Sequence, residues 1–187
     1  MEPKKMTNII RLNKKRGRIF TEFYKLLSAS GKDKTKQNIC QRVLIDDKNL
    51  VATNGYYLFI LDKEKTEALT GYGFEDIENG TYEILKYTKS DILLMKDNDA
   101  KCFPDYNCII SDNPKFIRNS EIKENREGIE STFLYFLSYV MINPFYLKLI
   151  ADGLTYQVKK HGDHVLEFMN DNFRGVFMGI DTDDEII

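Results

Sequence analysis

Two histidines, His161 and His164 in the segment KHGDH, are the side chains best suited to binding a metal, with Asp163 beside them. Imidazole and carboxylate groups are ligands that suit zinc or iron. Gly162 and Asp163, however, predict a hairpin turn here, where histidines are usually exposed and unliganded. No wider ligand set can be identified. We therefore expect no metal site, and a small metal-dependent enzyme centred on this turn is kept as the third functional hypothesis.

Catalytic motifs are absent from the sequence. There is no GxSxG, HExxH, P-loop or GxGxxG segment. Cys40, Cys102 and Cys108 form an odd set without a CxxC pair, which indicates reduced and mostly buried thiols. The carboxylates of the tail DTDDEII, residues 181–187, are better explained by a solvated end of the chain than by a cation site. We expect a protein without enzymatic activity and without a cofactor.

Phosphate binding is the chemistry that the charge distribution favours. Residues 1–36 contain eleven Lys and Arg against three Asp and Glu, whereas the remaining residues contain 16 against 26. The basic block consists of Arg11, Lys14, Lys15, Arg16, Arg18, Lys25, Lys32, Lys34 and Lys36. Such a block attracts nucleic-acid phosphates without reading base sequence. The more common alternative for a run of charge is a solvated face or a mobile arm.

The bulk composition indicates a globular protein. The chain has 187 residues, of which 42% are hydrophobic, and this is enough for one good core or two small ones. It has no apolar run long enough to span a bilayer, and the basic N-terminal stretch lacks the apolar segment and cleavage site of a secretory signal. We expect a cytoplasmic protein.

The first half of the chain predicts a strand, a helix and several further strands. Apolar residues at helical spacing predict an amphipathic helix over 17–30, after a short strand at 8–12. A meander of two or three strands is predicted over 38–64, with turns at 46–49 and at Asn54-Gly55. Residues 64–80 are predicted to form a loop or an insertion, followed by strands at 81–87 and 90–95, the second of which can also be a short helix. FPDY, residues 103–106, predicts a rigid corner before a strand at 107–110.

The second half is predicted to repeat this architecture, although the two halves share no clear sequence identity. Residues 111–130 predict a polar, flexible crossing, and the apolar segment 133–142 predicts a strand. Asn143-Pro144 predicts a helix start, and Gly153 its end. Strands are predicted at 155–160, 165–170 and 174–180, before an acidic tail at 181–187. The expected fold is a single α+β domain with halves at 6–110 and 131–180, each with one helix on a shared antiparallel sheet.

Four segments resemble the bacterial DNA polymerase III beta subunit, the DNA sliding clamp. NLVATNGYYLFIL resembles its strand-turn-strand run L-x-x-x-A-T-D-G-x-R-L, and FPDY resembles its F-P-D-Y segment. INPFYLKLIADGL resembles its late helix F-N-P-x-Y-L-x-x-x-L, and GVFMGI stands where the family ends in a strand bearing M-P-M. The segments occur in the family's order. The resemblance implies a clamp-like module in which Phe103 lies in the core and Asp105 caps neighbouring amides.

The resemblance also implies candidate binding residues. Clamps surround duplex DNA with helices whose cations meet phosphates, which implies DNA contacts from Lys14, Lys15, Arg16, Arg18, Lys25 and Lys148. The family's last strand lines a groove for peptides of replication proteins, which corresponds here to Phe177, Met178 and Ile180. Three residues depart from the family: Asn54 replaces an acid, Tyr57 a basic residue, and Gly179 the proline after Met178. The last change favours a core-filling role for this strand.

Two hypotheses about the function are favoured. The first is a non-enzymatic clamp-like protein of a phage or mobile-element replication system, which binds duplex DNA nonspecifically or a replication protein and can form a homo-oligomer. The second is a protein-interaction or inhibitory scaffold that has the clamp fold and no DNA contact.

Overall fold

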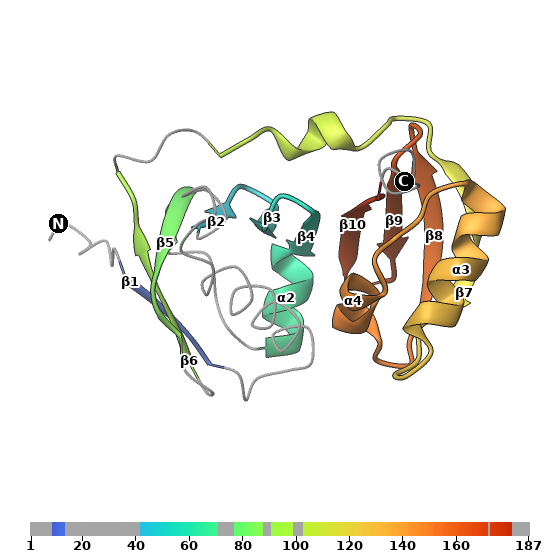
Figure 1. Cartoon of the computed structure of the whole chain (residues 1–187). Coiled ribbons are helices and arrows are strands. Elements are labelled where there is room, and N and C mark those ends of the chain that lie inside the picture. The colour runs from blue at the N-terminus through green and yellow to red at the C-terminus, as the bar shows by residue number, and fades with distance from the viewer. Residues whose placement is uncertain are drawn as a thin grey trace, which may run out of the picture. The chain divides into compact units, whose positions relative to one another are not determined.

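The chain folds into two compact units, shown in Figure 1. This computed structural model describes residues 9–13, 42–70, 77–87, 91–98, 103–171 and 173–180. The first unit contains Met1–Gly55 and Phe59–Phe103, and the second contains Tyr56–Leu58 and Pro104–Ile187. Every strand pair with a defined register in the described residues is antiparallel. The fold class is therefore α+β, as predicted.

The first unit is built mainly of strands. Its elements are β1 (Ile9–Asn13), β2 (Arg42–Ile45), β3 (Asn49–Thr53), β4 (Tyr57–Asp62) from Phe59 onward, α2 (Lys63–Thr70), β5 (Gly80–Tyr87) and β6 (Asp91–Lys96). The strand order is β1-β6-β5-β2-β3-β4. This confirms the predicted strands at 8–12, 81–87 and 90–95 to within about one residue. The predicted helix at 17–30 lies outside the described residues.

The meander from β2 to β4 is the best-predicted part of this unit. The carboxylate of Asp46 accepts hydrogen bonds from the backbone N–H of Lys48, at 2.8 Å, and of Asn49, at 2.6 Å, and closes the first turn. Gly55 has φ +90°, which the second turn requires. The apolar strands bury Val43, Ile45 and Phe59 completely, so they supply the core of the unit.

Helix α2 corrects the prediction that 64–80 is a loop. The Asp62 carboxylate accepts a hydrogen bond from Lys65 N at 3.0 Å, and Thr66 Oγ1 donates to Asp62 O at 2.6 Å. Asp62 therefore caps a helix that begins directly at the end of β4. This mainly polar helix has very little of the apolar stripe that predicts a helix from sequence.

In its described residues, the second unit contains β7 to β10 and four helical segments. These elements are η3 (Tyr106–Ile109), β7 (Lys115–Glu121), α3 (Glu127–Ser138), α4 (Pro144–Leu147), η4 (Lys148–Ile150), β8 (Thr155–His161), β9 (Val165–Met169) and β10 (Arg174–Met178). The strand order is β10-β9-β8-β7, so β7 is paired to β8 (Figure 1). The three last strands confirm the prediction for the end of the chain.

The strand predicted at 107–110, directly after FPDY, is wrong. Residues Tyr106–Ile109 form the 3-10 helix η3, because the Asp105 carboxylate accepts a hydrogen bond from Asn107 N at 3.0 Å. The capping role expected of Asp105 is thus confirmed. Tyr106 is buried, whereas Phe103, which we expected in the core, is only half-buried.

The flexible crossing predicted at 111–130 is also wrong. Its residues form β7 and the start of α3. The strand looks polar because it is mostly exposed, with Ser120 as its buried residue, and because polar side chains are tolerated on strands with a solvated face. Packing against α3 supports it: Ser120 Oγ donates to the Glu130 carboxylate, and Ile122, just after β7, is completely buried.

The strand predicted at 133–142 is mostly the helix α3, which ends at Ser138. The predicted helix start at Asn143-Pro144 is confirmed, since Asn143 Oδ1 accepts a hydrogen bond from Phe145 N at 2.9 Å. That helix continues into η4, and Gly153 follows with φ +76°. The second unit therefore contains α3 in addition to the helix that the sequence predicted.

Candidate functional site

Of the six cations predicted to contact DNA, Lys148 lies in the described part of the chain. It is exposed at the start of η4, between the completely buried side chains of Leu147 and Ile150. These two residues anchor the helical turn, so Lys148 projects from an ordered backbone. Lys14, Lys15, Arg16, Arg18 and Lys25 lie outside the described residues. Whether the six cations gather on one surface stays a prediction.

Several other cations of the second unit are engaged within the protein. Lys123 Nζ lies 2.8 Å from Glu121 Oε2, and Lys160 Nζ donates to Ser138 O at 2.9 Å. The Arg118 guanidinium lies over the Phe133 ring, 4.7 Å from its centroid. Helix α3 itself contains no Lys or Arg. Cations for phosphate contact on this unit therefore come from outside α3.

The three residues predicted to bind a partner divide between the core and the surface. Phe177 is completely buried, and its ring packs edge-on against Phe168 at a centroid distance of 5.3 Å. Met178 and Ile180 are 39% and 37% exposed. The backbone N–H of Met178 donates to Tyr56 O at 2.8 Å. Met178 and Ile180 are therefore accessible at the surface, whereas Phe177 is a core residue.

Aromatic residues that the sequence analysis did not select lie beside this strand. Tyr56 is 53% exposed and stacks on Tyr146, with 6.1 Å between ring centroids. Phe145, 64% exposed, contacts Tyr146 edge-on. Burial, together with the neighbouring Tyr56, raises the pKa of Tyr146 above its ordinary value, so its ring stays neutral near neutral pH. The signal in the sequence was the Tyr56-Tyr57 pair directly after the Asn54-Gly55 turn.

Gly179 shows why this chain lacks the family's proline after Met178. Its backbone N–H donates to His164 O at 2.6 Å, and proline has no such donor. A Cβ atom at this position would lie 2.7 Å from Val140 Cγ1 and 3.1 Å from His164 O. Glycine is therefore required by close backbone packing next to Met178 and Ile180.

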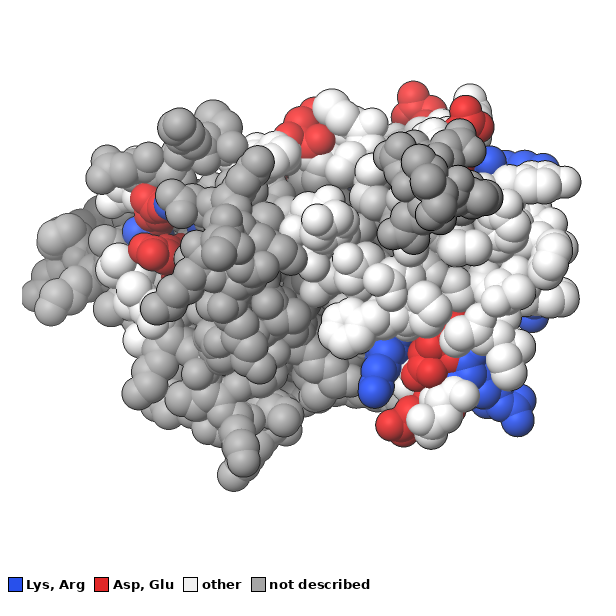
Figure 2. Space-filling model, viewed as in Figure 1, with Lys and Arg blue, Asp and Glu red and all other residues white. Residues whose placement is uncertain are grey.

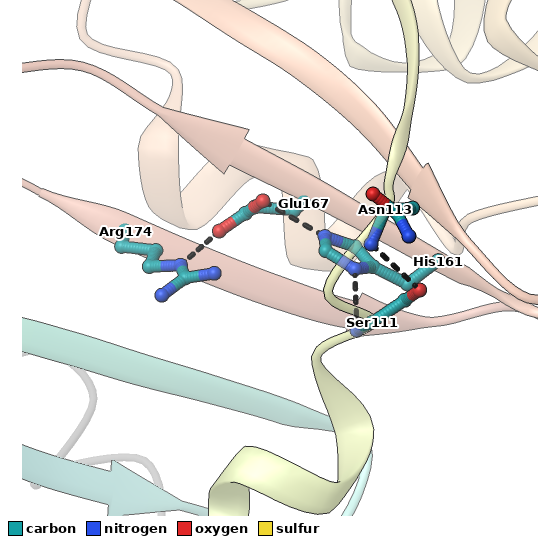
Figure 3. A network of polar contacts seen from close by, with 5 residues as sticks. All are labelled: Ser111, Asn113, His161, Glu167 and Arg174. Carbon is teal, nitrogen blue, oxygen red and sulfur yellow. Dashed lines mark hydrogen bonds and ion pairs between the residues drawn. The ribbon is translucent and has the colours of Figure 1, made fainter.

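The predicted environment of His161 is wrong, because this histidine is buried. Ser111 N donates to His161 Nδ1 at 2.9 Å, so Nε2 carries the proton and donates to Glu167 Oε2 at 2.8 Å (Figure 3). The other Glu167 oxygen accepts a hydrogen bond from Arg174 Nε. His164 is exposed, as expected for the turn. Figure 3 thus shows a structural network in which both His161 ring nitrogens are occupied.

Metal ligation and membrane insertion find no support in the described ranges. Within them, no group of three or more His, Cys, Asp or Glu side chains lies close enough together to hold a metal ion. The same ranges contain no helix that is both long and apolar enough to cross a membrane.

Asp105 also controls the thiol of Cys108. Hydrogen bonds from the backbone and side chain of Asn107 and from Cys108 lower the pKa of Asp105. The resulting carboxylate accepts a hydrogen bond from Cys108 Sγ at 3.5 Å and raises the pKa of this exposed thiol. Cys108 is therefore a poor thiolate at neutral pH.

Comparisons with known proteins identify the fold. No family model and no curated protein matches the chain. The solved DNA polymerase III beta subunit of Borrelia burgdorferi matches with a TM-score of 0.54 at 16% identity, over 97% of this chain and 66% of that one.

Two further clamps give similar matches. The beta chain of Streptococcus pneumoniae matches with a TM-score of 0.51 at 11% identity, over 97% of this chain and 67% of that one. The Helicobacter pylori beta clamp matches with a TM-score of 0.50 at 10% identity, over 97% of this chain and 68% of that one. The chain spans about two thirds of the length of these clamps. It has the fold of the bacterial DNA polymerase III beta sliding clamps.

Proposed function

We propose that this protein is a non-enzymatic, cytoplasmic clamp-type protein that binds duplex DNA through phosphate contacts. The contacts come from the basic residues of the first 36 positions and from Lys148 on η4. Because such contacts involve phosphates and not base edges, binding is independent of sequence and weakened by salt.

The observation that carries this proposal is a clamp-type fold in a chain whose positive charges are concentrated near the N-terminus. The antiparallel α+β fold of this chain matches solved clamps over nearly the whole length of the chain. Its first 36 residues carry a surplus of eight positive charges, although the whole chain has a net charge of −2. A concentrated positive segment on an overall acidic protein attracts DNA locally while the remaining surface repels it.

A replication protein is the second partner that we propose. The Helicobacter pylori clamp was solved bound to a DNA ligase peptide. In this chain, Met178 and Ile180, together with the exposed Tyr56 and Phe145, offer apolar surface for a short hydrophobic peptide. Titration of that ligase peptide tests this part of the proposal: Met178→Asp is expected to weaken the binding, whereas absence of binding to the unaltered protein rejects it.

The DNA proposal is tested by equilibrium binding to two labelled duplexes of unrelated sequence at low salt. We expect equal affinity for both, and a loss of about tenfold or more on neutralising Lys14, Lys15 and Arg16 together. Lys123→Ala is the matched control, since this exposed lysine is paired with Glu121 outside the basic block. Lack of binding to either duplex at low salt rejects the DNA role.

A protein-interaction scaffold without DNA contact is the second candidate function. The observation that favours it is helix α3, which has no cation and exposes large apolar side chains. Such a surface is suited to protein contact and not to phosphate contact. The low-salt experiment separates the two candidates, because only the first binds duplex DNA.

A further inference from the structure

After Phe103 the chain leaves the first unit and enters the second through residues 104–113, called here the entry segment. Figure 1 draws this segment in yellow-green along the top. Most of its residues are exposed, and Tyr106 is its buried residue. Ile110 N donates to Asn107 O at 3.1 Å, a bond that stays within the segment. Stretches with local hydrogen bonds and an exposed backbone open at low cost in free energy, so this segment depends on specific contacts to stay in place.

One such contact is a hydrogen bond from the segment to the sheet. Ser111 N donates to His161 Nδ1 at 2.9 Å, across 50 positions of the sequence. Ser111 is exposed, whereas His161 at the end of β8 is only 2% exposed, so the segment lies over the ring (Figure 3). The acceptor is an imidazole nitrogen and not a carbonyl oxygen. Protonation can therefore abolish this bond.

The bond from Ser111 and a charged His161 exclude each other. In the neutral ring, Nδ1 accepts from Ser111 N while Nε2 donates to Glu167 Oε2 at 2.8 Å. An imidazolium has an N–H group at both nitrogens. Its Nδ1–H would face the N–H of Ser111, and two donors cannot form a hydrogen bond. Protonation of His161 therefore requires Ser111 to move away.

The charges on the neighbouring strands make this protonation feasible. Glu167 on β9 faces Nε2 and keeps its hydrogen bond in either form of the ring, so its carboxylate favours the imidazolium. Arg174 on β10 opposes the imidazolium, but it is bound to the other Glu167 oxygen. On β8, Lys160 Nζ is engaged with Ser138 O at 2.9 Å. Glu167 is thus a ready counter-ion, and the contact with Ser111 is what protonation must break.

The remaining titratable groups near the ring lie in or close to solvent. Lys159, on β8, is partly exposed, and the groups of the segment and of the adjoining turn are exposed, namely Asp105, Asp112, Asp163 and His164. Figure 2 shows acidic side chains at the upper margin, along which Figure 1 draws the entry segment. Water screens these exposed charges, so they act on His161 more weakly than Glu167 does.

We propose that His161 is a proton-operated latch for the entry segment. The neutral ring holds Ser111 on the sheet, and the protonated ring releases it. The released form binds one more proton than the held form, so attachment is complete at neutral pH and is lost as the pH falls below about 6.5, where an exposed histidine becomes protonated. Release frees the stretch that joins the second unit to Phe103. The latch does not depend on the proposed function, because it requires neither DNA nor a partner.

Amide hydrogen exchange of the full chain, followed by NMR from about pH 8 to about pH 5, tests the latch. Protection of Ser111, relative to the exchange rate of an unfolded chain, should fall by up to about tenfold for each pH unit below the midpoint, because one proton is taken up. Gly153 is the internal control: its N–H donates to Ile122 O at 2.8 Å in the same unit and should keep its protection. An equal fall at Gly153 means general unfolding and rejects the latch.

The two histidines of the chain provide matched variants. His161→Asn keeps an acceptor near the position of Nδ1 that does not titrate, so protection of Ser111 should no longer depend on pH. His164→Asn changes the exposed histidine of the same turn and should leave the pH dependence as it is. If His161→Asn does not fold, the nitrogen-15 shifts of the His161 ring in the unaltered protein decide. Nδ1 should become protonated over the same pH range in which Ser111 loses protection.

Three results overturn the proposal. The first is protection of Ser111 that stays constant over the whole pH range. The second is the same fall in a folded His161→Asn variant, which would assign the effect to another group. The third is a fall at Ser111 while Nδ1 of His161 stays unprotonated.

Discussion

His161 Nε2 lies 2.8 Å from Glu167 Oε2, and both side chains are 1% exposed. This buried pair joins the start of the second unit to its sheet, because Ser111 N donates to the other ring nitrogen of His161. Arg174 binds the remaining Glu167 oxygen from β10. The KHGDH segment thus has a structural role through its first histidine, and removal of any member leaves a buried polar group without its partner.

Removing the carboxylate of this network should destabilise the protein strongly. Glu167→Ala is expected to lower the free energy of unfolding by about 3–5 kcal/mol, because the buried N–H of His161 loses its acceptor. Glu167→Gln retains an acceptor and should cost less. Urea unfolding measures the change. Asp163→Ala is the control, since that side chain is 89% exposed, and should lie within about 0.5 kcal/mol of the unaltered protein. Equal effects of Glu167→Ala and Asp163→Ala would contradict the network.

The cap of η3 should weaken in acid. Hydrogen bonds from Asn107 lower the pKa of Asp105 in the folded protein. The contribution of Asp105 to stability is therefore complete above its unfolded-state pKa of about 4, and is lost as pH falls through the lower folded-state pKa. Thermal unfolding from neutral pH to about pH 3 should show the unaltered protein losing its advantage over Asp105→Ala. A constant difference between the two proteins across this range would show that the carboxylate does not cap η3.

Two glycines should respond to alanine in opposite ways. Gly179→Ala is expected to destabilise the protein by about 1–3 kcal/mol, because its Cβ would lie 2.7 Å from Val140 Cγ1. Gly128→Ala, where a Cβ meets open space, should be neutral or stabilise α3 by up to about 1 kcal/mol. Chemical denaturation of the two variants and of the unaltered protein compares them. A tolerated Gly179→Ala would remove the packing explanation for the missing proline.

The orientation of α3 can be tested by truncating one residue on each side. Leu134→Ala removes a completely buried side chain and should cost about 2–5 kcal/mol. Phe136→Ala removes a larger side chain that is 70% exposed, and the free energy of unfolding should change by less than about 0.5 kcal/mol. Urea unfolding of both variants provides the comparison. A reversed order of the two costs would mean that α3 faces the other way.

The strands could be predicted from the sequence where local residue types determine the secondary structure. The β2–β4 meander follows from β-branched and aromatic residues between an Asp46 turn and a Gly55 turn, both of which form as expected. Asn143 and Pro144 likewise start a helix in nearly any context. The clamp fold was recognised from segments of this kind.

The predictions failed where tertiary contacts determine the secondary structure or the burial of a residue. Phe133–Leu137 looked like a buried strand because apolar residues were assigned to the core, whereas α3 buries serines and exposes Phe133 and Phe136. Lys115–Glu121 looked like a linker because a mostly exposed strand can be polar. His161 was expected in solvent because Glu167, which holds it, is six residues away on another strand. Neither the outer face of α3 nor this network has a sequence signature.

The salt dependence of duplex binding is the most direct test of the proposed function. The logarithm of the binding constant should fall linearly with the logarithm of salt concentration, with a slope of about −0.9 for each phosphate contact. Neutralising Lys14, Lys15 and Arg16 should make the slope shallower by roughly 2–3, whereas Lys123→Ala should leave it unchanged. A slope that is the same in all three proteins, or no binding at the lowest salt concentration, would contradict phosphate contact by the basic block.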